Sequence, residues 1–459
     1  MERASSLPKY LYVSLGTTAC SLLTAGCGMH TAWTSPTLIK LQAEDSPIPI
    51  TNDEGSWIAT SLFFGSIIGA IIWNFISLRY TKRSILLAAC AIFIVSWLII
   101  AFTSSYHLLL VARLLAGISD SIVVCSVSLF LGEVSGSGRR GLVITVSTLS
   151  ISIGAFFINI LGSYASIQTT ALVSLTIPLL SLCFFVSIPD SPYDLIQMNM
   201  MSEAEVSLKK YRGVDVVEED FNRINEAIQE VATSTSSYLD LLVLRSYRKS
   251  LLTILGVRSI YQLSGFTTIK LYSQLIFFDI GGNNAFAFTL SSIHFSMTIV
   301  FTFVSLWLID TVGRKPLMLS STVAIVLSLL TLTIFYYLKD AYMISQHVFV
   351  YVSSASLLIY VSTFSLGLSF APSVLMGEIF PPSLKSFAST VHQIYFCILI
   401  IFTTKLFQLT GDEYGLQVPF LIFTICTFFG IFFIAYRVPE TKNKTLEEIQ
   451  SLLKNEDQR

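Results

Sequence analysis

Long apolar runs follow one another along most of the chain and are separated by short polar segments. Each run has roughly the 20 residues that an α-helix needs to cross about 30 Å of hydrocarbon. The runs are continuous and do not alternate between polar and apolar positions, so they predict helices and not the strands of a membrane barrel. Twelve membrane-spanning helices are predicted, at residues 10–32, 57–78, 84–103, 106–132, 142–162, 170–188, 251–278, 286–309, 317–338, 347–376, 386–409 and 416–437.

One long polar segment, residues 189–250, divides this series into six spans and six spans. Within the segment, Ser202–Tyr211 and Glu218–Val231 have the pattern of short amphipathic helices. We therefore predict an all-α membrane protein with two six-helix halves and a small cytoplasmic helical linker domain. The predicted divisions are 1–188, 189–250, 251–437 and a polar tail at 438–459.

Composition agrees with lipid as the main solvent of the chain. The 459 residues are 53% hydrophobic and only 12% charged, whereas an ordinary soluble domain is roughly 25% charged. A net charge of −1 provides no basic footprint for nucleic acid. The seven cysteines lie in apolar runs without metal-binding spacing, so we expect neither a metal nor a cofactor. No nucleotide loop or nucleophile triad is present, so no enzymatic activity is expected.

The basic residues are distributed unequally between the two sides of this topology. With both termini and the linker on one side, only Lys40 and Lys339 lie on the other side. Four basic residues lie within spans, and 22 of the 28 Lys and Arg lie on the side of the termini. The positive-inside rule therefore predicts that both termini are cytoplasmic.

A Glu–basic pair is repeated at the end of the fourth span of each half. GEVSGSGRRG places Glu133 seven residues before Arg140, and GEIFPPSLKS places Glu378 seven residues before Lys385. Charge-assisted bonds between such groups are directional and can be broken, which suits a gate that closes and opens. The alternative is that these residues are ordinary positive-inside anchors in solvated loops.

A second motif is repeated between the second and third spans of each half. DTVGRK at 310–315 joins these spans in the second half, and RYTKR at 79–83 joins them in the first. Two similar halves related in parallel are the architecture of major facilitator transporters, in which substrate lies between the halves. The predicted cytoplasmic gating network comprises Lys82, Arg83, Glu133, Arg140, Asp310, Arg314, Glu378 and Lys385.

Taken together, the motifs resemble those of the sugar porter family of the major facilitator superfamily. They are DTVGRK, GEVSGSGRRG, PDSP (189–192), YQLSG (261–265), GEIFPPSLK and PETKNKTLEEIQ (439–450). Within that family they look most like the insect facilitated trehalose transporters and their relatives. The resemblance implies facilitated passage of a hexose, or of a disaccharide such as trehalose, across the plasma membrane by alternating access. The expected partners are a small sugar and the lipid bilayer, and the sequence does not indicate an oligomeric state.

The sequence departs from the family at the expected sugar site. The family's seventh span typically begins QQ-x-x-G-x-N, whereas this chain has Tyr261, Gln262 and Thr267 at the three polar positions. The N-terminal loop also lacks the acid and the glycine of the family motif. The resemblance places the remaining substrate-binding positions at Thr148, Thr298, Ser373 and Phe396.

Several charged residues fall within predicted spans, where a central charge costs roughly 2.5–3.5 kcal/mol on insertion scales. Arg113 and Asp120 lie in the fourth span and are expected to find partners inside the bundle. Lys270 and Lys405 lie near predicted outer ends, where their side chains can reach the interface. A basic vestibule that favours an anionic solute is the alternative.

The first span carries no carboxylate, and by the resemblance this favours a uniporter over a proton-coupled porter. Two other functions stay open at this point. One is a carrier of a non-hexose or anionic solute, suggested by the altered sugar site. The other is a non-transporting sugar sensor built on the same fold.

Overall fold

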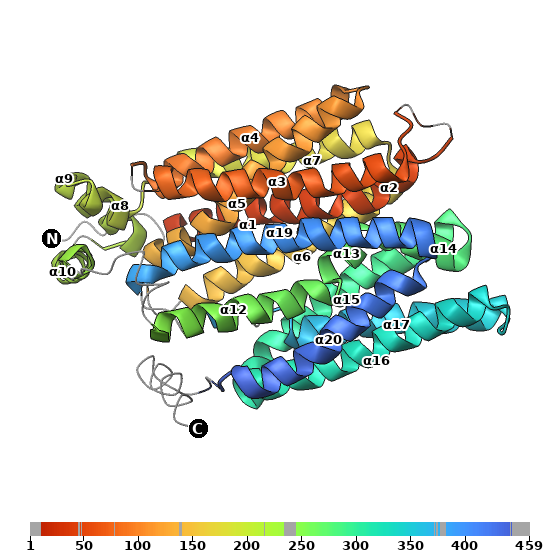
Figure 1. Ribbon diagram of the computed structural model, residues 1–459. Helices are drawn as coiled ribbons and strands as arrows, with labels where there is room; N and C mark the ends of the chain where they lie inside the picture. Colours follow the sequence, from red (N-terminus) through yellow and green to blue (C-terminus); the bar gives the residue numbers. More distant parts are fainter. Residues whose placement is uncertain are drawn as a thin grey trace. The chain divides into compact units, whose positions relative to one another are not determined.

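In the part of the chain that the computed structural model describes, the regular secondary structure is helical (Figure 1). That part is residues 11–440 and 442 without 45, 47, 78, 137–139, 215, 234–244, 371, 373–374 and 377–381. Within its helices, no side chain is described at 140, 227, 230–233, 245–247, 310 or 382–386.

The helices of the first half and the linker follow the predicted spans closely. They are α1 (Leu11–Ala32), α2 (Thr34–Leu41), α3 (Asn52–Ile76), α4 (Lys82–Phe102), α5 (Tyr106–Val134), α6 (Arg140–Tyr164), α7 (Ile167–Ser187), α8 (Pro192–Gln197), α9 (Met201–Arg212) and α10 (Glu218–Thr233). Those of the second half are α12 (Arg245–Leu263), α13 (Phe266–Leu271), α14 (Ser273–Gly281), α15 (Asn284–Val312), α16 (Arg314–Asp340), α17 (Gln346–Gly367), α19 (Pro382–Tyr414) and α20 (Gln417–Arg437).

Eleven helices in the described residues are long and apolar enough to cross a membrane. They account for every predicted span except the seventh, predicted as one helix over 251–278. That segment is divided instead into α12, α13 and α14. At the first break Gly265 has φ +85°, a left-handed conformation that favours glycine, and an added Cβ would lie 2.3 Å from the Phe423 ring.

By its internal contacts the chain forms two compact units. Unit 1 comprises Met1–Thr31, Phe64–Ile158 and Ala165–Ser236. Unit 2 comprises Ala32–Phe63, Asn159–Tyr164 and Ser237–Arg459. Unit 2 thus combines the second half with two short segments of the first half. The divisions predicted at 188 and 250 stay predictions.

In unit 1, α4 packs against α5 and α7 (Figure 1). Glycines allow α1 and α6 to approach at backbone distance. A Cβ at Gly28 would lie 1.9 Å from the Ile151 carbonyl oxygen, and one at Gly154 would lie 2.0 Å from that of Ala25. Close packing through small residues is a normal way to associate helices in lipid, where apolar contact alone does not distinguish a neighbour from solvent.

The linker helices of unit 1 correspond to the two amphipathic helices predicted from the sequence, with α8 preceding them. They share a small apolar core, which is Leu195, Ile196, Ala204, Leu208, Val217 and Ile224. Tyr211 anchors this core to the end of the sixth span, since its hydroxyl donates to the Pro189 carbonyl oxygen at 2.7 Å. Burial raises the pKa of the Tyr211 phenol well above its ordinary value, so it remains a neutral donor.

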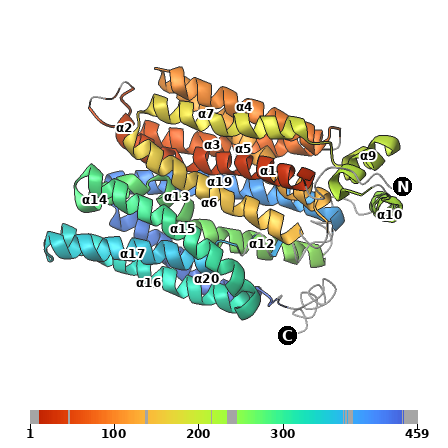
Figure 2. The same cartoon turned by 180° about the vertical axis from the view of Figure 1, so that it is seen from behind.

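In unit 2, α16 packs against α17 and α20, α15 packs against α17, and α12 packs against α19 and α20. The view from behind shows α15, α16 and α17 on the near side of this unit (Figure 2). The short helix α14 contacts both α15 and α2. These contacts place the broken seventh segment beside α19, where the candidate site lies.

Candidate functional site

Gln262 lies at the end of α12, just before the break in the seventh segment, and is completely buried. Its Nε2 donates to the Thr403 hydroxyl at 2.8 Å, and its Oε1 accepts from the Thr267 hydroxyl at 2.8 Å. Thr268 joins the same cluster through Thr403 at 3.2 Å. The predicted pair of Gln262 and Thr267 is therefore in contact, but its hydrogen bonds are made to the protein itself.

The backbone at this break is also hydrogen-bonded. The Tyr360 hydroxyl donates to the Ser264 carbonyl oxygen at 3.0 Å, and Gly265 N donates to the Gln262 carbonyl oxygen at 2.9 Å. Irregular backbone at membrane depth persists only where protein or a polar cavity satisfies it. The amide, the hydroxyls and the phenol together make the break a polar centre inside unit 2.

Tyr261 and Phe396, both predicted at the site, face each other across α12 and α19 with ring centroids 5.8 Å apart. Tyr261 also packs edge-on against Phe266 and Phe364, which stack on each other at 3.8 Å. The buried guanidinium of Arg258 lies over both predicted rings, 3.3 Å from the Phe396 centroid and 4.6 Å from that of Tyr261. The result is an aromatic cluster that carries one cation.

The remaining predicted substrate positions are less closely associated. Thr298 on α15 is buried, and its hydroxyl donates to the His294 carbonyl oxygen at 3.0 Å. Thr148 on α6 is exposed in unit 1 and donates to the Ile144 carbonyl oxygen at 2.9 Å. Ser373 lies outside the described residues. The structure thus gathers Tyr261, Gln262, Thr267 and Phe396, and the roles of all seven positions stay predictions.

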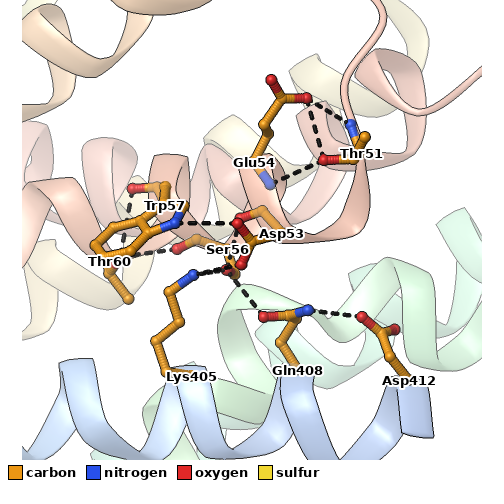
Figure 3. A network of polar contacts seen from close by, with 9 residues as sticks. All are labelled: Thr51, Asp53, Glu54, Ser56, Trp57, Thr60, Lys405, Gln408 and Asp412. Atoms are coloured by element: carbon orange, nitrogen blue, oxygen red, sulfur yellow. Dashed lines mark hydrogen bonds and ion pairs between the residues drawn. The ribbon is translucent and has the colours of Figure 1, made fainter.

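A second polar region, the Asp53–Lys405 network, joins the start of α3 to α19 within unit 2 (Figure 3). Lys405 Nζ lies 2.9 Å from Asp53 Oδ1 and 3.9 Å from the Trp57 ring centroid, and it donates to Ser56. The Ser56 hydroxyl donates to Gln408 Oε1 at 3.2 Å. Residues of the first half are thereby hydrogen-bonded to residues of the second.

The sequence positions Asp53 for this contact through a local helix start. Thr51 and Glu54 form a capping box, in which Glu54 N donates to the Thr51 hydroxyl at 3.2 Å and Thr51 N donates to Glu54 Oε2 at 2.8 Å. Asn52, next to them, donates to Asp412 Oδ1 at 3.0 Å. The capping box fixes the first turn of α3, so that Asp53 is presented to Lys405 (Figure 3).

Two further contacts in unit 2 join the same halves. The hydroxyls of Ser35 and Ser273 lie 2.8 Å apart. Gln274 Nε2 donates to Asn159 Oδ1 at 3.0 Å and to the Ser163 hydroxyl at 2.8 Å. These contacts involve neutral groups only, and the Asp53–Lys405 network contains a single ion pair. The contacts between the halves can therefore separate without leaving several charges unpaired.

Lys405→Met should weaken the Asp53–Lys405 network. Because Asp53 is more than half exposed, we expect a loss of only about 0.5–1 kcal/mol, equivalent to a two- to fivefold shift toward separated halves. A Thr60→Cys reporter, buried in α3, should react faster with a thiol reagent in this background. The matched control is Lys339→Met, because Lys339 pairs with Asp279 inside the second half at 3.5 Å. Equal labelling of both backgrounds would contradict the prediction.

The predicted gating residues Lys82 and Glu133 are in contact, with 2.7 Å between Lys82 Nζ and Glu133 Oε1. Lys82 also pairs with Asp194, whose Oδ2 accepts from the Lys82 backbone N at 2.7 Å. Arg83 pairs with Asp190 at 3.2 Å. The RYTKR motif at 79–83 has no carboxylate of its own. The segment at the start of the linker provides two, from Asp190 and Asp194.

The second-half gating residues are described only in part. Arg314 N and Lys315 N donate to the carboxylate of Glu440 at 3.2 and 3.0 Å, so Glu440 caps the start of α16. Arg314 Nη1 also donates to the Ile309 carbonyl oxygen at 3.2 Å. Glu378 lies outside the described residues, as do the side chains of Arg140, Asp310 and Lys385. The repeated Glu–basic pairs stay predictions.

The charges within spans have neighbours in the fold. Arg113 is completely buried, and its Nη1 donates to the His30 carbonyl oxygen at 2.7 Å. Asp120 lies near enough to Arg113 and Cys27 to interact with both. Lys270 Nζ lies 5.8 Å from the Phe295 ring centroid.

Sequence comparison identifies the family of the chain. The family described as "Sugar (and other) transporter" matches residues 27–453. The chain belongs to this family. It is 29% identical over 456 residues to the facilitated trehalose transporter Tret1 of Polypedilum vanderplanki, covering 98% of this chain and 89% of that protein. It is also 29% identical to Tret1 of Culex quinquefasciatus, covering 92% and 82%.

Solved structures show which fold this family member has. The inward-open xylose transporter XylE from E. coli superposes with a TM-score of 0.79 at 19% identity, over 96% of this chain and all of that one. The proton:xylose symporter XylE bound to 6-bromo-6-deoxy-D-glucose gives 0.77 at 20% identity, covering 96% and 99%. This sugar transporter family member is therefore a multi-pass membrane protein with the major facilitator fold.

Sequence reasoning missed four residues that make central contacts. Asp190 and Asp194 pair with Arg83 and Lys82 at the start of α4, and Asp53 pairs with Lys405. Arg258 lies within the predicted seventh span, 251–278, but sequence reasoning gave it no role. The PDSP motif contained a signal for Asp190, because it places an acid directly after the sixth span.

Proposed function

We propose that the protein is a facilitative sugar transporter of the plasma membrane that moves a hexose, or a disaccharide such as trehalose, by alternating access. The observation that supports this most directly is the polar centre at the broken seventh segment. Gln262, Thr267 and Thr403 bring an amide and hydroxyls together, and Tyr261 precedes Gln262 in α12; such groups recognise a polyhydroxylated ring. No bond chemistry is proposed.

Alternating access requires contacts that close one side and can later part. The Asp53–Lys405 network and the Gln274–Asn159 bond have this character. The first joins the two halves through a partly exposed ion pair, and the second joins them through buried neutral amides. On the other side we propose that Lys82, Arg83 and Glu133 act with their second-half counterparts. In the structure the hydrogen bonds of the polar centre are made to the protein itself. When the halves rearrange, its amide and hydroxyl groups exchange these bonds for bonds to substrate hydroxyls.

Uptake in proteoliposomes tests the proposal directly. Purified full-length protein should accelerate entry of radiolabelled glucose or trehalose down its gradient. A protonophore should not change the initial rate, since a uniporter uses no proton gradient. Uptake that collapses with the protonophore would indicate a proton-coupled carrier, and no uptake of any sugar in the panel would overturn the proposal.

The proposed orientation places both termini in the cytoplasm, as the distribution of Lys and Arg indicates. An epitope tag at either end should then bind antibody only after the cells are permeabilised. A tag inserted in the polar segment after Lys40 should be labelled on intact cells. Labelling of the C-terminal tag on intact cells would contradict the orientation.

A further inference from the structure

Arg258 is a buried cation at the substrate site proposed above, and no described residue neutralises it. It lies on α12 four residues before Gln262, so both side chains project from the same face of the helix. Its side chain is only 9% exposed in unit 2. Its guanidinium contacts the rings of Phe396 and Tyr261 and, within the described part of the chain, no group of opposite charge.

The N–H donors of this guanidinium are not used by the residues that the structure describes. Among the described residues, none accepts a hydrogen bond from Arg258, and its Nε is buried without a partner. Arg113, the buried arginine of unit 1, differs because its Nη1 donates to a backbone carbonyl oxygen at 2.7 Å. Buried charges in proteins are normally paired or hydrogen-bonded, since an uncompensated one is costly. Arg258 therefore lacks a hydrogen-bond acceptor among these residues, and a ligand can provide one.

The stacking geometry decides which part of the guanidinium is available. A ring 3.3 Å from Cζ covers one face of the planar group and stabilises its charge. Hydrogen bonds of guanidinium lie in its plane, so stacking leaves the N–H fork free for a two-oxygen acceptor. A carboxylate matches that fork with two parallel bonds.

A second polar group without a partner among the described residues lies near it on α19. His392 precedes Phe396 by one helical turn on the same face, and its Nε2 is buried without a hydrogen-bond partner among the described residues. Arg258 provides one full positive charge, and the buried His392 provides one neutral polar group. That balance suits a monoanion better than a phosphate dianion, which binds several cationic groups in most sites.

We propose that Arg258 binds the carboxylate of a sugar acid, so that this carrier accepts polyhydroxylated monocarboxylates of the uronate type. The inference rests on the proposed transport function and names its substrate class. The carboxylate lies against the Arg258 fork with His392 beside it. The ring hydroxyls lie toward Gln262 and Thr267, one turn further along the same segment.

The unmodified protein provides the first test, by ligand binding to full-length protein in detergent. Glucuronate is compared with glucuronamide, which keeps the shape and the hydroxyls but has no charge. One charge-assisted contact predicts about 10- to 100-fold tighter binding of glucuronate. Equal binding of the two, or tighter binding of glucuronamide, overturns the inference without the need for any variant.

Variants then test whether Arg258 is the residue responsible. Arg258→Gln should lower the ratio of glucuronate to glucuronamide affinity to near one, and Arg258→Lys should retain part of it because the charge remains without the fork. A ratio is insensitive to the fraction of folded protein. An unchanged ratio in Arg258→Gln overturns the assignment.

The two proposals fail in different ways. If glucose or trehalose is taken up while glucuronate and glucuronamide bind equally, sugar transport stands and the Arg258 inference is overturned. If no sugar, charged or neutral, binds or is taken up, the transport proposal fails and the inference fails with it. If glucuronate uptake is saturable and glucuronamide competes only weakly with it, the result supports both proposals.

Discussion

Lys82→Met is expected to lower the free energy of unfolding by about 3–5 kcal/mol, because removing one partner from a buried ionic cluster leaves its charges uncompensated. Lys82 is 8% exposed and holds the carboxylates of Glu133 and Asp194 together. Without the ammonium group, two nearby carboxylates repel each other in a poorly solvated site. The measurement is thermal unfolding of the purified protein in detergent.

Two comparisons make this prediction specific. Lys209→Met removes an exposed pair with Glu205 on α9 and should change stability by no more than about 0.5 kcal/mol. Glu133→Gln should cost much less than Lys82→Met, because the remaining pair of Lys82 and Asp194 is balanced in charge. If Lys82→Met melts at the same temperature as Lys209→Met, the cluster does not support the fold.

Gln262→Ala should reduce the initial rate of sugar uptake at least tenfold. The change leaves the buried Thr267 hydroxyl without its acceptor, at a cost of about 1–3 kcal/mol, and removes the donor to Thr403, which keeps its bond to the Leu399 carbonyl oxygen. It also removes the amide that we propose exchanges these bonds for substrate hydroxyls. Uptake in oocytes, normalised to protein at the cell surface, gives the measurement.

Gln168→Ala is the matched control, since Gln168 is an exposed glutamine at the start of α7. Thr267→Val should share part of the loss, because it leaves Gln262 Oε1 buried without a donor. Normal uptake by Gln262→Ala would remove the main physical support for a sugar site at the broken helix. Equal losses in Gln262→Ala and Gln168→Ala would point to general destabilisation.

The sequence by itself determined where the spans lie, apart from the break in the seventh. Apolar length is a local property, and a helix in lipid must satisfy its own backbone, so eleven described helices correspond to runs visible in the sequence. The motifs around Glu133, Arg140, Glu378 and Lys385 likewise indicated the family, because each motif is a short local pattern.

The same local character explains why the seventh span was predicted as one helix. Its break depends on the φ of Gly265 and on the ring of Phe423 packed against it.

Only the tertiary structure decided which polar groups meet. Lys82 pairs with Asp194, 112 residues away, and Lys405 pairs with Asp53, 352 residues away. No local pattern specifies such partners, because they depend on how distant helices pack. Arg258 shows the same limit: its place within a span was visible in the sequence, whereas its stacking on Phe396 and its unused donors follow from the approach of α12 to α19. Burial decides how strongly these charges affect stability, since the same charges in a solvated loop would contribute little to it.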